Sequence, residues 1–189
     1  MPDNPFFAIT SFTIEDWNTG SFPYREFDVV KVPSGAASGQ FLVSISDNNT
    51  GNGIPSGSGQ NIGDWVNYQY SGLDFRGIWN PSFDSSINHE PRTNYIQFGD
   101  GYFQREANGV NHQQIILNAT FQEIPDNEAK SLMSFFEYKG GVGKFKMTLP
   151  TPYGGEKLYV AKNWKHNFNG YNRNNIDTLF IEVFDQSFE

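Results

Sequence analysis

The chain has 189 residues, of which 37% are apolar and 16% aromatic, and it has no cysteine. This is enough material for one large domain or two small ones, and the missing cysteine excludes disulfides and thiolate metal sites. The net charge is −8, of which −6 falls in the first 74 residues. Nucleic-acid backbones require clustered Lys and Arg, so we expect no sequence-specific nucleic-acid binding. No apolar run approaches membrane-spanning length and the first residues are not a signal peptide, so we expect synthesis in the cytoplasm and no membrane partner.

The first part of the chain has the composition of a small β-rich module. Residues 24–32, 39–46 and 64–68 are short runs rich in β-branched and aromatic residues, which favours strands. Between the second and third runs, residues 47–61 form a loop of Gly, Ser, Asn and Pro. The charge asymmetry and a turn-rich stretch at residues 71–93 predict a domain boundary near Gly72, with one module over residues 1–72 and a second domain over residues 73–189.

A series of short motifs runs through this module: Tyr24, Asp28-Val-Val, Gly39-Gln-Phe, Asn48-Asn-Thr-Gly, Pro55 and Trp65. Their order resembles that of the family 5/12-type carbohydrate-binding modules. The resemblance implies that exposed rings stack on the faces of sugars, and the candidate rings are Tyr24, Trp65 and Tyr68. The alternative is that the same rings form the core, because a module of this size needs its aromatic residues for stability.

The most informative stretch lies in the middle of the chain. Residues 74–81 are expected to form an extended lead-in, because the residue before Pro81 avoids the helical region. Residues 82–93 are polar and turn-rich and are expected to form a loop. Two aromatic arms then flank Gly99-Asp100-Gly101, which predicts a β-hairpin over residues 95–105, since Gly supplies the positive φ that the turn needs. Asp100 is interpreted as a turn residue rather than a cation ligand.

Alternation and periodicity predict the next two elements. Residues 112–124 are the clearest strand, with Ile115, Leu117, Ala119 and Phe121 on one face. A helix is expected over residues 125–139. Pro125 suits its first turn, an apolar stripe repeats at helical spacing, and Gly140-Gly141 ends it. The stripe consists of Ala129, Leu132, Met133 and Phe136. A helix with one apolar stripe is expected to pack on a sheet.

Strands are predicted again over residues 144–149, 157–164 and 178–185, with an Asn-rich loop at residues 168–175. The last strand has apolar residues on both faces, which implies burial on both sides. Leu179, Ile181 and Val183 share one face, while Phe180, Phe184 and Phe188 lie opposite. We interpret the phenylalanine stripe as a candidate interface between subunits.

The hairpin region contains two distinctive segments, Gln97-Phe-Gly-Asp-Gly-Tyr-Phe-Gln-Arg105 and Asn108-Gly-Val-Asn111. Together they resemble the signature of the minor tail protein M family of lambda-type long-tailed phages, and the resemblance runs from about residue 79 to residue 189. The matching positions, interpreted as determinants of the hairpin and of ring packing, are Phe98, Gly99, Asp100, Gly101, Tyr102, Gln104 and Arg105.

The resemblance implies a mainly β fold, a tail-tube-like β-sandwich with one packed α-helix. It also implies a structural protein of the virion: a homohexameric ring at the tail tip. This ring would join the tail tube protein to the hub and baseplate and line the channel for DNA.

We find no catalytic motif in the sequence. His89, His112 and His166 are far apart, and no metalloprotease spacing or nucleophile elbow is present. We therefore expect no catalytic residues, no metal site, no cofactor and no enzyme activity. The alternative function is that of a carbohydrate-binding protein that attaches to host-surface polysaccharide.

Overall fold

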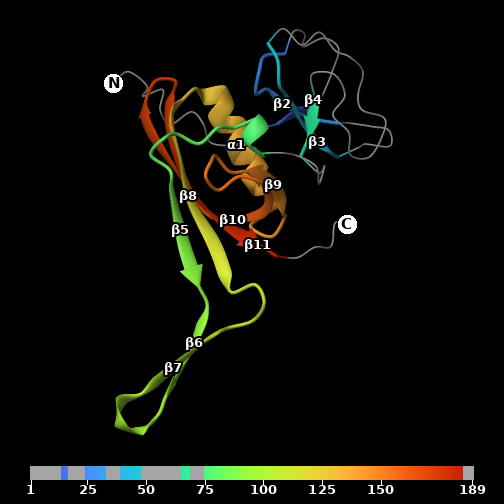
Figure 1. Cartoon of the computed structure of the whole chain (residues 1–189). Coiled ribbons are helices and arrows are strands. Elements are labelled where there is room, and N and C mark those ends of the chain that lie inside the picture. The colour runs from blue at the N-terminus through green and yellow to red at the C-terminus, as the bar shows by residue number, and fades with distance from the viewer. Residues whose placement is uncertain (1–13, 17–23, 33–38, 48–64, 69–74, 185–189) are drawn as a thin grey trace. The chain divides into compact units, whose positions relative to one another are not determined.

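The computed structural model describes residues 14–16, 24–32, 39–47, 65–68 and 75–184. By its contacts the chain divides into two compact units. One unit contains residues 1–73 together with residues 125–138, and the other contains residues 74–124 and 139–189. The elements of each unit are drawn in Figure 1.

The first unit contains a four-stranded sheet of short strands in the order β1-β2-β3-β4. The strands are β1 (Glu15–Asp16), β2 (Val29–Lys31), β3 (Phe41–Ser44) and β4 (Trp65–Asn67), and all neighbours are antiparallel except β1 and β2. The core of this sheet is apolar and aromatic. It consists of Tyr24, Val30, Val32, Leu42 and Trp65. The ring of Tyr24 meets that of Trp65 edge to face, with centroids 5.2 Å apart.

The helix α1 (Asp126–Lys139) belongs, up to residue 138, to this first unit. Tyr68 donates its hydroxyl hydrogen bond to the carbonyl of Ser131 at 2.9 Å, and its ring lies edge-on to Phe135. Phe41 of β3 likewise meets Tyr138 edge to face. Near the start of the helix, the side-chain amide of Asn127 donates to the carbonyl of Glu26 at 2.8 Å. Because these contacts lie on one side of α1, that side is fixed against the segment around β3 and β4.

The predicted apolar stripe of α1 is confirmed, but the helix buries more than that stripe. Ala129, Leu132, Met133 and Phe136 are all buried, and so are Ser131, Ser134 and Phe135. Two of these extra residues are serines, whose hydroxyls donate to carbonyls three residues earlier within the helix. Because two of the additional buried residues are polar, the apolar pattern of the sequence indicated only one buried face.

The second unit is built on a five-stranded antiparallel sheet in the order β5-β8-β11-β10-β9. Its strands are β5 (Ser86–Pro91), β8 (Gln113–Ile124), β9 (Phe145–Thr148), β10 (Glu156–Gly170) and β11 (Arg173–Val183). Alternate residues of β8 face the core as predicted, since Ile115, Leu117, Ala119 and Phe121 are at most 6% exposed. A separate hairpin, β6 (Thr93–Gln97) and β7 (Phe103–Ala107), extends from the end of β5 and β8 (Figure 1).

The core of the second unit centres on Phe75. This residue lies in a 3₁₀ turn, Phe75–Gly77, and the turn is closed by a hydrogen bond from the amide of Trp79 to the carbonyl of Phe75. The ring of Phe75 contacts rings from three strands and that of Trp79. These are Phe121, Phe145 and Phe180, with centroids 6.0, 5.3 and 5.2 Å away, and Trp79 at 5.3 Å. Aromatic pairs in this edge-to-face and tilted range add to the stabilisation from burial.

A charged group is held at one end of this core. Glu182 is 5% exposed, and its carboxylate accepts hydrogen bonds from the amide of Ile115 at 3.0 Å and from the ammonium of Lys157 at 2.8 Å. The neighbouring hydroxyl of Tyr159 is buried without a hydrogen-bond partner. Burial and the nearby charge of Glu182 both raise the pKa of Tyr159 above its usual range, so this hydroxyl stays neutral.

The structure corrects three secondary-structure predictions. Residues 75–77 form a 3₁₀ turn rather than an extended lead-in, because Phe75 must turn into the core. The predicted loop over residues 82–93 contains β5, which is stabilised by pairing with β8 rather than by any alternation of its own. The Asn-rich stretch at residues 168–175 is mostly the end of β10 and the start of β11, joined by a tight turn with Asn172 at φ 53°.

The fold class is confirmed as mainly β with a single α-helix among the described residues. None of the helices that the structure describes is long and apolar enough to cross a membrane. The division into modules at residue 72 stays a prediction.

Candidate functional site

The candidate site is the hairpin β6–β7. Its two strands pair in antiparallel register from Thr93 opposite Ala107 to Gln97 opposite Phe103. The amide of Phe98 then donates to the carbonyl of Tyr102 at 2.9 Å, which closes a three-residue loop. Asp100 and Gly101 in this loop have φ of 66° and 81°. Asp and Gly both tolerate this conformation, which explains why this sequence makes the turn.

Large apolar side chains are exposed on both faces of this hairpin. Tyr95 is 66% exposed, Ile96 43%, Phe98 46%, Tyr102 67% and Phe103 53%. The register places Tyr95 and Phe103 on one face and Ile96, Phe98 and Tyr102 on the other. A two-stranded hairpin is marginally stable in water when nothing covers it. Five exposed apolar side chains on such a ribbon therefore mark a surface for interaction.

Local contacts order the aromatic side chains without covering them. The rings of Phe98 and Tyr102 lie 5.9 Å apart on either side of the turn. The guanidinium of Arg105 lies over the ring of Tyr95, 5.8 Å from its centroid, as in a cation–π pair. These contacts hold the rings in place on the surface, where a partner can bury them.

A short loop joins the hairpin to the sheet. The amide of Arg92 donates to the carbonyl of His112, and the amide of Asn108 donates to the carbonyl of Arg92. Between Asn108 and His112 the chain makes an extra turn, with Gly109 at φ 83°. The segment Asn108-Gly-Val-Asn111 thus sets the point at which the hairpin leaves the sheet, and Val110 in it is 96% exposed.

The signature residues predicted from the sequence therefore lie together on one element. Phe98 to Tyr102 form the tip, and Gln104 and Arg105 lie on β7. Sequence reasoning missed the importance of Tyr95, Ile96 and Phe103, which share this exposed surface. The sequence did contain a signal for this surface, because apolar residues lie on both faces of the two-stranded hairpin. A strand with only one buried face would instead alternate between apolar and polar residues.

The candidate sugar-stacking residues are buried rather than exposed. Tyr24, Trp65 and Tyr68 are 7%, 1% and 0% exposed, so none of these rings offers a face to a ligand. Burial also raises the pKa of the Tyr68 hydroxyl well above its usual range. The alternative reading, in which these rings form the core of the module, describes their positions.

The candidate interface stripe on the last strand is divided by the structure. Phe180 is fully buried, with its ring edge-on to Phe145 at 5.1 Å, so it is a core residue and not an interface residue. Phe184 follows the end of β11 and is half-buried, and Phe188 lies outside the described residues. A period-two argument could not separate these residues, because it assigns a face without saying where the core ends.

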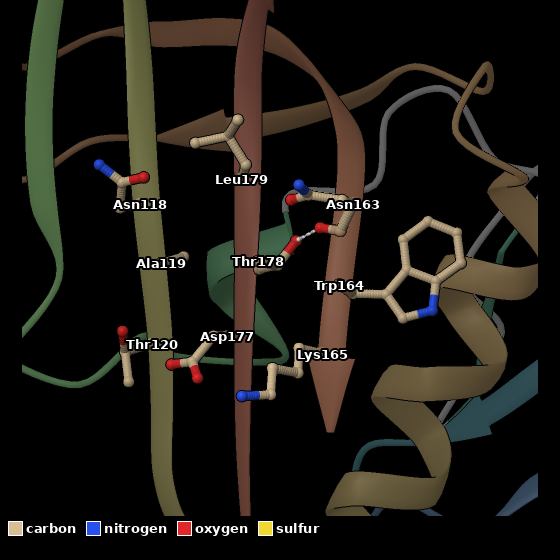
Figure 2. Close-up of a pocket in the computed structure, with 9 residues that line it drawn as sticks. All are labelled: Asn118, Ala119, Thr120, Asn163, Trp164, Lys165, Asp177, Thr178 and Leu179. Carbon is tan, nitrogen blue, oxygen red and sulfur yellow. Dashed lines mark hydrogen bonds between the residues drawn. The ribbon is translucent and has the colours of Figure 1, made fainter. Parts of the chain in front are cut away.

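A concave feature lies on the face of the five-stranded sheet (Figure 2). It is an open depression of about 390 Å³ over the middle of β8, β11 and β10. Beside it the ladder shifts register at residues 161–163, and the hydroxyl of Thr178 donates to the carbonyl of Asn163 at 2.8 Å. The only charged residues lining it are Lys165 and Asp177. A lining with one cation and one anion provides no catalytic set.

Titratable side chains do not gather into a site in the part of the chain that the structure describes. No group of three or more His, Asp or Glu residues there could hold a metal ion. His89 pairs with the hydroxyl of Tyr153, and His166 pairs with the side chain of Asn174.

Comparison with known proteins identifies the family. A family model described as phage minor tail protein matches residues 77–184, which is more than half of the chain. The chain belongs to the phage minor tail protein family. It is thus a structural component of the phage tail in the virion, and the predicted resemblance to minor tail proteins is confirmed.

Two individual proteins are similar to parts of the chain. Tail tip protein M of Escherichia phage lambda is 36% identical over 72 residues, which is 38% of this chain and 65% of that protein. A chain from the tail of an empty GTA particle with C6 symmetry is 14% identical, with a TM-score of 0.36 over 67% of this chain and 87% of that one. A likeness this slight supports no argument about fold or symmetry.

Proposed function

We propose that this minor tail protein forms a homohexameric ring at the tail tip, which joins the tail tube to the hub and leaves a central channel for DNA. The observation that carries the proposal is the exposed hairpin β6–β7 in a member of this family. Its five large apolar side chains have no cover on either face within the described chain. A tail component that presents such a surface is suited to continuous contact with other subunits.

The geometry of a ring follows from a head-to-tail contact. When one part of a chain binds a different part of the next copy, the contacts repeat and close if the rotation allows. The hairpin is one such part, because β6 and β7 extend beyond the end of the five-stranded sheet (Figure 1). The tail tube protein and the hub are the expected neighbours above and below the ring.

The proposed role is positional, so it rests on buried area and fit between subunits. The proposed assembly therefore predicts that removal of the exposed hairpin prevents incorporation into tails without unfolding the rest of the chain.

The test uses purified virions and a variant without the hairpin. Residues 93–107 are replaced by a short glycine-containing turn, which the hydrogen bond between Asn108 and Arg92 allows because it holds the two ends together. The matched control is Val142→Ser, at a side chain that is 82% exposed elsewhere in the same unit. Quantitative mass spectrometry should find wild type and control at one ring per tail and the hairpin variant missing. Absence of the wild-type chain from virions, or full incorporation of the hairpin variant, would refute the proposal.

A further inference from the structure

The second unit carries an apolar groove at its edge. It has a volume of about 220 Å³ and is lined by Phe83, Ile87, Leu117, Met147 and Leu149, with Arg76 at its polar side. Ile87 lies on β5 and Met147 on β9, which are the two outer strands of the five-stranded sheet. Phe83 stands fully exposed beside the groove. The groove therefore lies where the two edges of the curled sheet approach each other.

The hairpin of the same chain cannot fill this groove. From Ile87 the chain runs along β5 and then β6 to Phe98, eleven residues further on. At about 3.3 Å per residue this extended path spans roughly 35 Å. Figure 1 shows β6 and β7 extending away from the sheet beyond the end of β5. A hairpin that fills the groove must therefore come from a second copy.

The tip of the hairpin fits the groove in size and in charge. An apolar cavity of roughly 150 Å³ holds one benzene ring, so a groove of 220 Å³ can hold one aromatic side chain. Phe98 and Tyr102 form an exposed ring pair at the tip, with the carboxylate of Asp100 between them in the loop. Arg76 supplies a cation at the groove, where its guanidinium also approaches the carbonyl of Thr148 at 3.5 Å. Acid at the tip and base at the groove are complementary.

We propose that the tip of β6–β7 of one copy seats in the groove of a second copy. One ring of the Phe98–Tyr102 pair fills the groove against Ile87 and Leu149, the other covers its mouth, and Asp100 faces Arg76. The contact joins two different surfaces, so it repeats from copy to copy and builds a ring or a filament rather than a closed pair. This inference names the interface of the proposed ring and rests on that proposed function.

The first test is cysteine crosslinking. The chain has no cysteine, so the introduced thiols are the only ones present. Tyr102→Cys and Phe83→Cys are combined in one chain; the two side chains are 67% and 112% exposed, so neither change should disturb the fold, and Phe98 is kept to fill the groove. Purified tails treated with a short bis-maleimide should give covalent multimers from the double variant. Each single variant should stay monomeric. The control combines Tyr102→Cys with Val142→Cys and should give no multimers, because Val142 is 82% exposed but is not among the residues that line the groove.

The outcomes separate this interface from the proposed function. If the wild-type chain is absent from virions, the proposed ring is refuted. If the chain is present in tails but the double variant gives no more multimers than the control, the interface is refuted and the proposed ring is not. Dimers from Tyr102→Cys alone would mean that tips meet tips, which also overturns the inference.

A second test addresses the charge pairing. Asp100→Asn keeps a residue that tolerates the positive φ of the turn but removes the charge, and Arg76→Gln removes the opposite charge. Each variant is expressed together with equal amounts of tagged wild type, and the ratio of the two is measured in purified tails. Each single change should lower incorporation roughly tenfold, as expected for loss of a charged hydrogen bond. The double variant should be no worse than either single variant, and independent, multiplying losses would refute the pairing.

Discussion

Replacing Phe180 by Ala tests whether this residue belongs to the core rather than to an interface. Its ring is fully buried and meets Phe75 and Phe145 edge to face, at 5.2 and 5.1 Å. Truncation of a buried Phe to Ala costs about 3–5 kcal/mol, and two lost aromatic pairs favour the upper part of that range. For a chain of this size the loss should lower the melting temperature by about 6–20 °C. That is a large part of the stability of a typical domain.

The matched control is Phe184→Ala, four residues further along the same predicted stripe. Phe184 is half-buried and follows the end of β11, so its truncation should cost no more than about 1.5 kcal/mol. Urea unfolding followed by far-UV circular dichroism measures both changes in the free energy of unfolding. If the chain unfolds in two transitions, the comparison applies to the one that shifts. Equal losses for the two variants, or a loss below about 1 kcal/mol for Phe180→Ala, would refute the core assignment.

The other predictions concern the turn, the helix, a buried hydroxyl and the end of the last strand. Gly101→Val should destabilise the hairpin locally by about 1–3 kcal/mol through its positive φ alone, because a Cβ there meets no atom within 4 Å; amide exchange should rise in the hairpin while the melting temperature of the rest of the chain stays unchanged. Leu132→Asp should cost at least about 3 kcal/mol by burying a carboxylate, whereas the exposed Glu137→Ala should be nearly neutral in urea unfolding. Burial raises the pKa of Tyr159, so the unfolded chain loses this proton first and stability falls above about pH 10; Tyr159→Phe should flatten that fall and leave neutral-pH stability unchanged or higher. Phe184→Glu should leave the fold intact but abolish incorporation into tails, and normal virions would count against a role in the interface.

Elements with a local signal could be predicted from the sequence. The hairpin followed from Gly99-Asp100-Gly101, because few residues adopt the positive φ found at Asp100 and Gly101. Strand β8 followed from the alternation of Ile115, Leu117, Ala119 and Phe121 on one buried face, although Ile116 on the other face is buried as well. The start and end of α1 followed from Pro125 and Gly140, which have definite positions at helix ends. In each case the physical cause acts within a few residues.

Elements fixed by distant partners could not be predicted in this way. Strand β5 has five exposed residues in six, so only its pairing with β8 makes it a strand. Phe75 turns into the core because Phe121, Phe145 and Phe180 surround it, and these residues are far away in the sequence. Aromatic residues are equally ambiguous, because a ring can pack in the core or lie exposed for a partner. The aromatic character of the side chain alone does not distinguish the buried Trp65 from the exposed Tyr102.

The segment before the family match has a structural task that follows from its contacts. The match begins at residue 77 and includes α1, but one side of this helix is covered by residues that precede the match. Phe41 lies against Tyr138, and the buried hydroxyl of Tyr68 donates to the carbonyl of Ser131. Without these partners, a helix side that includes Phe135 would face water, at a cost of about 1.5–3 kcal/mol for each large side chain. Covering this side explains the burial of Tyr68 without any ligand, and it ties the segment before the match to a helix that lies within the matched residues.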